Sequence, residues 1–224
     1  MKISVAIDGP SGAGKSTVAR ALAKVFHLIY VDTGAIYRTV GLGAQRAGIS
    51  SKDTQAVISL LPDLRIDIAY DAQGMQRMLL NGEDVSEEIR TPKSSIYASD
   101  VSAIPEVRSF LMEMQRDLAR KHGVVMDGRD IGTVVLPDAD VKIFLTASAE
   151  IRAQRRYLEL LQKGSTASCE DVLRDIEYRD LQDSTRSAAP LKPAEDAVFL
   201  DSSDLSFEQT VEAASDLIRE KMDL

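Results

Sequence analysis

The sequence predicts an α/β fold: a doubly wound, five-stranded parallel sheet with helices on both faces. Short apolar runs rich in β-branched residues alternate along the chain with stretches of helical periodicity, as in a buried parallel sheet. One segment, at roughly 60–95, breaks this alternation and has the pattern of a small antiparallel insertion. A chain of 224 residues can bury one sizeable core and still carry such an insertion.

Five apolar runs account for the predicted strands, and most of them lead directly into an acidic or hydroxyl residue. Ligands of such sheets bind at the carboxyl ends of the strands, so these terminal polar residues are candidates for the site. The runs are 3–7, 28–31 before Asp32, 124–126 before Asp127, 141–145 before Thr146, and 197–200 before Asp201.

Helices are predicted between these strands from apolar residues at helical spacing. The pattern covers 16–26 and 104–118, and the second stretch stops at 121–123. The last helix begins with a capping box, Ser206 to Gln209. In the insertion, residues 64–70 alternate in polarity, and Asn81-Gly82 is a strong hairpin signal.

The first predicted strand runs into a glycine-rich loop of the pattern G-x-x-x-x-G-K-S, which is followed by a helix. This context is that of a phosphate-binding loop, because backbone N–H groups and a helix N-terminus are presented to a polyphosphate. Lys15 is expected to reach the terminal phosphates, and Ser16 to offer its hydroxyl to Mg²⁺. The residues expected to bind a nucleoside triphosphate are Gly9, Pro10, Ser11, Gly12, Ala13, Gly14, Lys15, Ser16 and Thr17.

Composition excludes several classes of protein. A net charge of −8 argues against nucleic acid as a partner. One cysteine, Cys169, and two histidines rule out a disulfide framework and make a zinc site very unlikely. No long apolar stretch or signal-peptide pattern is present, so we expect a cytoplasmic protein without a membrane partner.

Two polar clusters follow predicted strands. The cluster 32–38 places a hydroxyl at a turn and Arg38 one helical turn further on; the alternative is a capped helix with a solvated arginine. In the cluster 127–132, Asp127 stands where a carboxylate is needed near Mg²⁺, directly or through water. Arg129 and Asp130 beside it could instead form a plain surface ion pair.

A third cluster is rich in arginine and surrounds a polar segment, 162–166, that resembles a mobile loop. The first set shares one helical face through i, i+3 and i+4 spacing, and the second falls at i, i+4 and i+7. Such sets are the cationic parts of a closing lid in phosphoryl transfer, although salt-bridge ladders give the same pattern. The residues are Arg152, Arg155 and Arg156, and then Arg179, Asp183 and Arg186.

No nucleophilic triad or metal cluster competes with this interpretation, and the guanine signature Asn-Lys-x-Asp of GTPases is absent. The residues therefore indicate a small kinase that transfers a γ-phosphoryl group to a small acceptor.

The chain closely resembles the bacterial cytidylate kinase family, a group of phosphate-loop (P-loop) nucleoside monophosphate kinases, essentially from end to end. The resemblance is carried by the loop 8–15 and by three further motifs, 32–38, 86–91 and 127–135. It implies a core (1–36, 98–150 and 187–224), a monophosphate-binding insertion (about 37–97) and a lid (about 151–186). It also implies the reaction ATP + (d)CMP → ADP + (d)CDP, with Mg²⁺, in a monomer.

The resemblance also assigns roles to individual residues. It implies that Ser99, Arg108 and Asp130 read the cytosine base, which fits the donor and acceptor groups of cytosine, and that Asp183 and Arg186 bind the sugar. Arg38, Arg129 and Arg179 are implied as the clamp on the α-phosphate, with Thr33 and Tyr37 on the same side. The lid arginines of the family are matched by Arg152, Arg155 and Arg156, of which Arg155 is expected beside ATP. The residues expected to act catalytically are Lys15, Arg129, Arg179, Arg152 and Arg156.

Two positions depart from the family pattern. Many relatives have glycine in place of Ser16 and a hydroxyl only at Thr17, so Mg²⁺ binding by Ser16 is an expectation to check. Thr33 replaces the serine of some relatives and keeps the hydroxyl.

Two other functions stay open: a kinase for UMP, AMP or shikimate, and a nucleotide-dependent binding module without catalysis.

Overall fold

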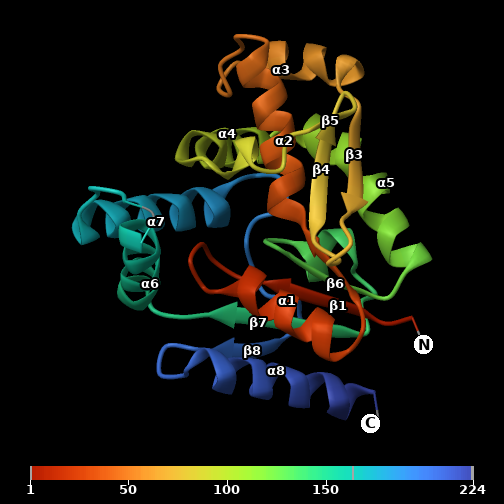
Figure 1. Ribbon diagram of the computed structural model, residues 1–224, viewed down its shortest axis with the longest axis vertical. Helices are drawn as coiled ribbons and strands as arrows, with labels where there is room; N and C mark the ends of the chain where they lie inside the picture. Colours follow the sequence, from red (N-terminus) through yellow and green to blue (C-terminus); the bar gives the residue numbers. More distant parts are fainter. Residues whose placement is uncertain (1, 163, 223–224) are drawn as a thin grey trace. The chain divides into compact units, whose positions relative to one another are not determined.

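The computed structural model describes residues 2–162 and 164–222 of the chain (Figure 1). Lys163, in the polar segment expected to be mobile, lies outside the described residues. Internal contacts divide the chain into two compact units. Unit 1 comprises Met1–Leu28 and Gly123–Leu224, and unit 2 comprises Ile29–His122.

The main sheet has five strands in the order β2-β6-β1-β7-β8, which confirms the predicted sheet. Within unit 1, β6 and β7 flank β1 in parallel register, and β8 extends the sheet beyond β7. Asp8 at the end of β1 stands opposite Gly128 of β6 and Phe144 of β7, so the carboxyl ends of these strands share one edge. The bounds are β1 Ser4–Asp8, β2 Ile29–Asp32, β6 Val124–Gly128, β7 Val141–Thr146 and β8 Val198–Asp201.

Two helices of unit 1, α1 and α8, lie side by side along this sheet (Figure 1). They bury apolar residues such as Leu22 and Ile218, both fully inaccessible. The predicted capping box is present at the start of α8, where Ser206 accepts from the Gln209 N–H and the Gln209 side chain accepts from Ser206. The helical elements of unit 1 are α1 Lys15–Val25, a π-helical turn Ile131–Val135, α6 Ala149–Gln162, α7 Cys169–Thr185 and α8 Phe207–Lys221.

Unit 2 contains the predicted antiparallel insertion as a three-stranded sheet, β3-β4-β5. Asn81 and Gly82 adopt φ of 52° and 85° between β4 and β5, as expected of the hairpin signal. Helix α5 begins at Pro105, where the missing N–H costs no hydrogen bond, and ends at Lys121, within the predicted stop at 121–123. The elements are α2 Thr33–Arg46, α3 Thr54–Leu60, a 3₁₀ turn Leu61–Asp63, β3 Ile66–Tyr70, β4 Gln76–Leu80, β5 Glu83–Asp84, a 3₁₀ turn Glu88–Arg90, α4 Pro92–Ser102 and α5 Pro105–Lys121.

Among the described residues, no helix combines the length and the apolar character needed to cross a membrane.

The turn that leaves β1 depends on the absence of a side chain at Gly9. Its φ is +150°, and a Cβ placed there would lie 1.9 Å from the carbonyl oxygen of Leu145 in β7. The backbone of the glycine-rich loop therefore passes β7 at a distance that only glycine permits.

We expect Gly9→Ala to destabilise the protein by more than the strain of a positive φ alone, which costs about 1–2 kcal/mol. Gly48→Ala is the matched control, because Gly48 has φ +70° and a Cβ added there would meet no atom within 4 Å. Urea denaturation followed by circular dichroism measures both. Equal losses in the two variants would show that β7 yields to the added methyl group.

Candidate active site

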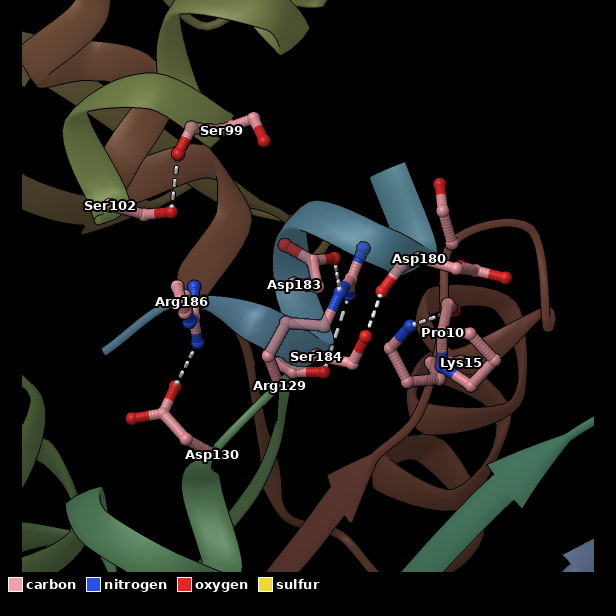
Figure 2. A network of polar contacts seen from close by, with 12 residues as sticks. Pro10, Lys15, Ser99, Ser102, Arg129, Asp130, Asp180, Asp183, Ser184 and Arg186 are labelled. Carbon is pink, nitrogen blue, oxygen red and sulfur yellow. Dashed lines mark hydrogen bonds and ion pairs between the residues drawn. The ribbon is translucent and has the colours of Figure 1, made fainter. Parts of the chain in front are cut away.

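The glycine-rich loop delivers Lys15 to the first position of helix α1. Gly14 caps the helix in a left-handed conformation, and no acidic side chain occupies the first turn. The helix N-terminus is therefore available to an external anion. Lys15 is only 5% exposed, and its Nζ donates to the carbonyl oxygen of Pro10 in the same loop at 2.7 Å (Figure 2).

Burial is the main reason why the pKa of Lys15 is lowered to about 7. The nearby charge of Arg129 lowers it further, while the carboxylates of Asp127, Asp183 and Asp8 act in the opposite direction. The lysine thus loses its proton more easily than an exposed lysine, and a bound anion would favour its charged form.

The structure brings together the two residues expected near Mg²⁺. Ser16 Oγ donates to Asp127 Oδ2 at 2.9 Å, and Asp127 ends β6 with 4% of its surface exposed. Hydroxyl and carboxylate oxygens are suitable ligands for Mg²⁺, which usually keeps several waters and few protein ligands. The described part of the chain has no group of three or more His, Cys, Asp or Glu that could hold a metal.

Two ion pairs join the turn after β6 to helix α7 and to the residue that follows this helix (Figure 2). Arg129 Nε donates to Asp183 Oδ2 at 2.7 Å, and Arg186 Nη2 lies 3.5 Å from Asp130 Oδ1. Neighbouring residues of the turn thus bind partners on α7 and the segment that follows it. The sequence left open a surface ion pair at Arg129 and Asp130, but Asp130 is buried: its side chain is 5% exposed and that of its partner Arg186 7%.

The first of these pairs is electrostatically balanced. Burial acts against both charges, but the carboxylate of Asp183 raises the pKa of Arg129 above its usual range. Burial also raises the pKa of Asp183. The charge of Arg129, and after it those of Arg186 and Arg179, lower this pKa by more, so that it lies below its usual value. Arg179, half-buried on α7, therefore contributes to the same field.

The three arginines expected in the lid have separate partners. Arg152 is buried, and its guanidinium donates to the carbonyls of Ala147 and Ser11 and pairs with Asp180 at 2.6 Å. The role of Asp180 is not evident from the sequence, where it is one of several acidic residues on α7. Arg155 donates to the hydroxyl and carbonyl oxygens of Ser202, and Arg156 pairs with Glu159.

In unit 2, the cluster after β2 combines a helix cap with an ion pair. Asp32 Oδ1 accepts from the Ala35 N–H, and its Oδ2 pairs with Arg38 at 2.8 Å. Gly34 leaves room for this pair, since a Cβ there would lie 3.0 Å from the arginine. The sequence left open a capped helix with a solvated arginine. The cap is present, but Arg38 is paired with Asp32 and its side chain is only 24% exposed.

The remaining residues expected at the acceptor lie in the same unit. The guanidinium of Arg108 stands 5.6 Å from the ring centre of Tyr37 and donates to the carbonyl of Ser102. The Ser102 hydroxyl in turn donates to the carbonyl of Ser99 (Figure 2). Thr33, the first residue of α2, is buried. Unit 2 thus holds Tyr37 and Arg108 in contact.

Asp8 is a polar residue that the sequence analysis missed. It ends β1 with 4% of its surface exposed, and burial raises its pKa to about 6. Its carboxylate accepts from the N–H groups of Ile131 and Gly132 at 2.7 Å each. An apolar run that ends in aspartate was the signal used for Asp127, and it applies equally to Asp8.

We expect Asp183→Ala to destabilise the protein by about 3 kcal/mol, because it leaves the buried charge of Arg129 without its partner. Asp216→Ala is the matched control: it breaks an exposed pair with Arg219 and should cost less than about 1 kcal/mol. Urea denaturation measures both. Equal costs would contradict the burial of the Arg129–Asp183 pair.

Known proteins are similar to this chain in sequence over nearly its full length. The family model described as cytidylate kinase matches residues 5–220. A cytidylate kinase of Caldicellulosiruptor saccharolyticus is 51% identical over 96% of this chain and 95% of its own. One of Carboxydothermus hydrogenoformans is 50% identical over 98% of this chain and 99% of its own.

Among solved structures, a shikimate kinase of Bacteroides thetaiotaomicron is similar over 99% of both chains, with a TM-score of 0.50 and 11% sequence identity. At this identity the similarity concerns the fold alone. The motifs 8–15, 32–38, 86–91 and 127–135, on which the resemblance was based, all lie within the matched range 5–220. On the strength of that match and of relatives that share half of its residues, the chain belongs to the cytidylate kinase family.

Proposed function

We propose that this chain transfers the γ-phosphoryl group of ATP to CMP or dCMP, giving ADP and CDP or dCDP. The observation that carries the proposal is the buried set of paired arginines and aspartates in the same unit as the phosphate-binding loop. Such a set provides cations for the transferring group and oriented carboxylates for a polar acceptor. The relatives of half-identical sequence, which are cytidylate kinases, support the choice of acceptor.

On the donor side, the loop amides and Lys15 hold the β- and γ-phosphates of ATP. Lys15 Nζ donates a hydrogen bond to the carbonyl oxygen of Pro10 in the loop, and a phosphate oxygen can replace this carbonyl as the acceptor. Ser16 and Asp127 would hold Mg²⁺, directly or through water. When bound, the metal ion neutralises charge on the phosphate oxygens.

On the acceptor side, the proposed base contacts are Asp130, Arg108 and Ser99. A carboxylate accepts from the exocyclic amino group of cytosine, and an arginine donates to its ring nitrogen and carbonyl. Uracil carries a carbonyl in place of the amino group. It would therefore place an acceptor oxygen against the buried carboxylate of Asp130, and the repulsion between them disfavours UMP.

The sugar and the α-phosphate of the acceptor are assigned to residues that are already paired. Asp183 and Arg186 bind the sugar; Arg38, Arg129 and Arg179 bind the phosphate, with Thr33 and Tyr37 nearby. Support comes from the short ion pairs of Arg38 and Arg129, because a guanidinium held by a carboxylate is pre-oriented for a phosphate. Asp32 and Asp183 are the orienting carboxylates.

The acceptor phosphate oxygen attacks the γ-phosphorus in line, and no covalent enzyme intermediate forms. The proposed lid is 151–186, which carries Arg152, Arg155 and Arg156, and the proposed insertion is about 37–97. Closure of the lid and the insertion excludes water, which would otherwise hydrolyse ATP. Arg156 is the easiest of the three to recruit, since its pair with Glu159 is partly exposed. We further propose a cytoplasmic enzyme that acts as a monomer, in line with the family.

A panel of acceptors tests the function. ADP release from Mg²⁺-ATP is measured in a coupled assay with CMP, dCMP, UMP, AMP and shikimate. We expect release to depend on an acceptor and kcat/KM to be highest for CMP or dCMP. A higher value for another acceptor would overturn the acceptor assignment, and release without any acceptor would overturn transfer to a nucleotide.

Binding of ATP should be accompanied by uptake of a proton at pH 8. Lys15 has a lowered pKa of about 7 and is mostly neutral at this pH, whereas phosphates favour its charged form. Lys15→Arg is the matched control, because arginine stays charged. Calorimetry in buffers of different ionisation enthalpy should show uptake of about one more proton by the wild type than by Lys15→Arg. Equal uptake would mean that Lys15 is already charged in the free protein.

A further inference from the structure

Asp8 holds the backbone of a distant segment of unit 1. It is the last residue of β1, and both of its carboxylate oxygens accept backbone N–H groups, those of Ile131 and Gly132, at 2.7 Å. These two residues open the π-helical turn Ile131–Val135. Burial raises the pKa of Asp8 to about 6, and the two N–H groups act in the opposite direction by stabilising its charged form.

The segment that Asp8 holds includes Asp130. Asp130 directly precedes the two bonded amides, and its own carbonyl accepts from the N–H groups of Val134 and Val135. On the other side of Asp130, Gly128 stands opposite Asp8 in the parallel ladder of β1 and β6. Asp130 itself has φ −149° and ψ 28°, outside the regular helix and strand regions. Its position is therefore set by the anchors on both sides.

We infer that Asp8 is a positioning residue for the acceptor: by holding the Ile131 and Gly132 amides, it fixes the turn that carries Arg129 and Asp130. The role rests on the acceptor-binding function proposed above for these two residues. Asp8 belongs to the strand that leads into the phosphate-binding loop, so one strand end supports both the donor loop and the turn that reads the acceptor.

The geometry makes this turn sensitive to small displacements. The Asp130–Arg186 contact is already 3.5 Å long, at the limit of a hydrogen bond, so a modest shift of the turn would break it. Asparagine at position 8 would keep the shape of the side chain but could accept only one of the two N–H groups. Its amide NH₂ would face the other N–H group. The turn would then move away from that group.

The test compares Asp8→Asn with Asp140→Asn. Asp140 is the matched control because its carboxylate accepts the N–H and hydroxyl of Ser4, at the opposite end of the same strand β1. We expect Asp8→Asn to reduce the ratio of kcat/KM for CMP to that for UMP by about tenfold. The ratio is the readout because both reactions use the same ATP site, so an effect of Asp8 on Lys15 cancels from it. Asp140→Asn should keep the wild-type ratio.

A purely structural role would give a different result. An Asp8→Asn protein that loses thermal stability but keeps the wild-type CMP-to-UMP ratio would overturn the inference. The same holds if Asp8→Asn and the smaller Asp8→Ser both fail to fold under conditions in which Asp140→Asn folds. If only Asp8→Ser folds, its CMP-to-UMP ratio decides by the same criterion.

The variant Asp130→Ala distinguishes a failure of the positioning role of Asp8 from a failure of the proposed base contact of Asp130. If Asp8 acts through Asp130, the double variant Asp8→Asn/Asp130→Ala should lose no more selectivity than Asp130→Ala alone. If Asp130→Ala is selective like the wild type, the proposed base contact fails and the inference with it. If Asp130→Ala loses selectivity while Asp8→Asn keeps it, only the positioning role fails.

Discussion

Buried charge must be compensated, and unit 1 is organised around this requirement. Lys15, Asp127, Asp130 and Asp183 are each less than a tenth exposed. Each has a partner: Lys15 the carbonyl of Pro10 in its own loop, Asp127 the hydroxyl of Ser16, and Asp130 and Asp183 an arginine of a distant segment. Strand β6, the phosphate-binding loop and helix α7 are held in place by the same pairs that orient the functional groups.

The elements that the sequence predicted well are those in which local patterns and burial agree. The apolar runs that became β1, β6 and β7 are buried along almost their whole length, so their hydrophobicity is nearly continuous. The run of β8 also forms a strand, paired with β7, although every second residue of it is exposed. The Asn81-Gly82 turn and the Ser206 capping box depend on neighbouring residues alone, and both occur as predicted. Residues at strand ends could also be identified, because parallel strands gather their carboxyl ends at one edge.

Partnerships between distant residues could not be predicted in the same way. Helical spacing places Arg152, Arg155 and Arg156 on one side of α6, but it cannot tell which oxygen each one meets. In the structure their partners are different: a loop carbonyl with Asp180, the Ser202 backbone, and Glu159. Likewise, Asp8 binds backbone amides more than 120 residues away, and amides leave no signature in a sequence.

The contacts of Arg152 determine how the α6–α7 pair can leave the phosphate-binding loop. One guanidinium holds the Ser11 carbonyl of the loop, the Ala147 carbonyl before α6 and the Asp180 carboxylate of α7. Close packing adds to this link, since a Cβ at Gly12 would lie 3.2 Å from Arg152 and 3.3 Å from Ile176. Separation from the loop would break these bonds and this packing together, because they share one side chain and one surface. We therefore expect any such separation to be cooperative and not graded.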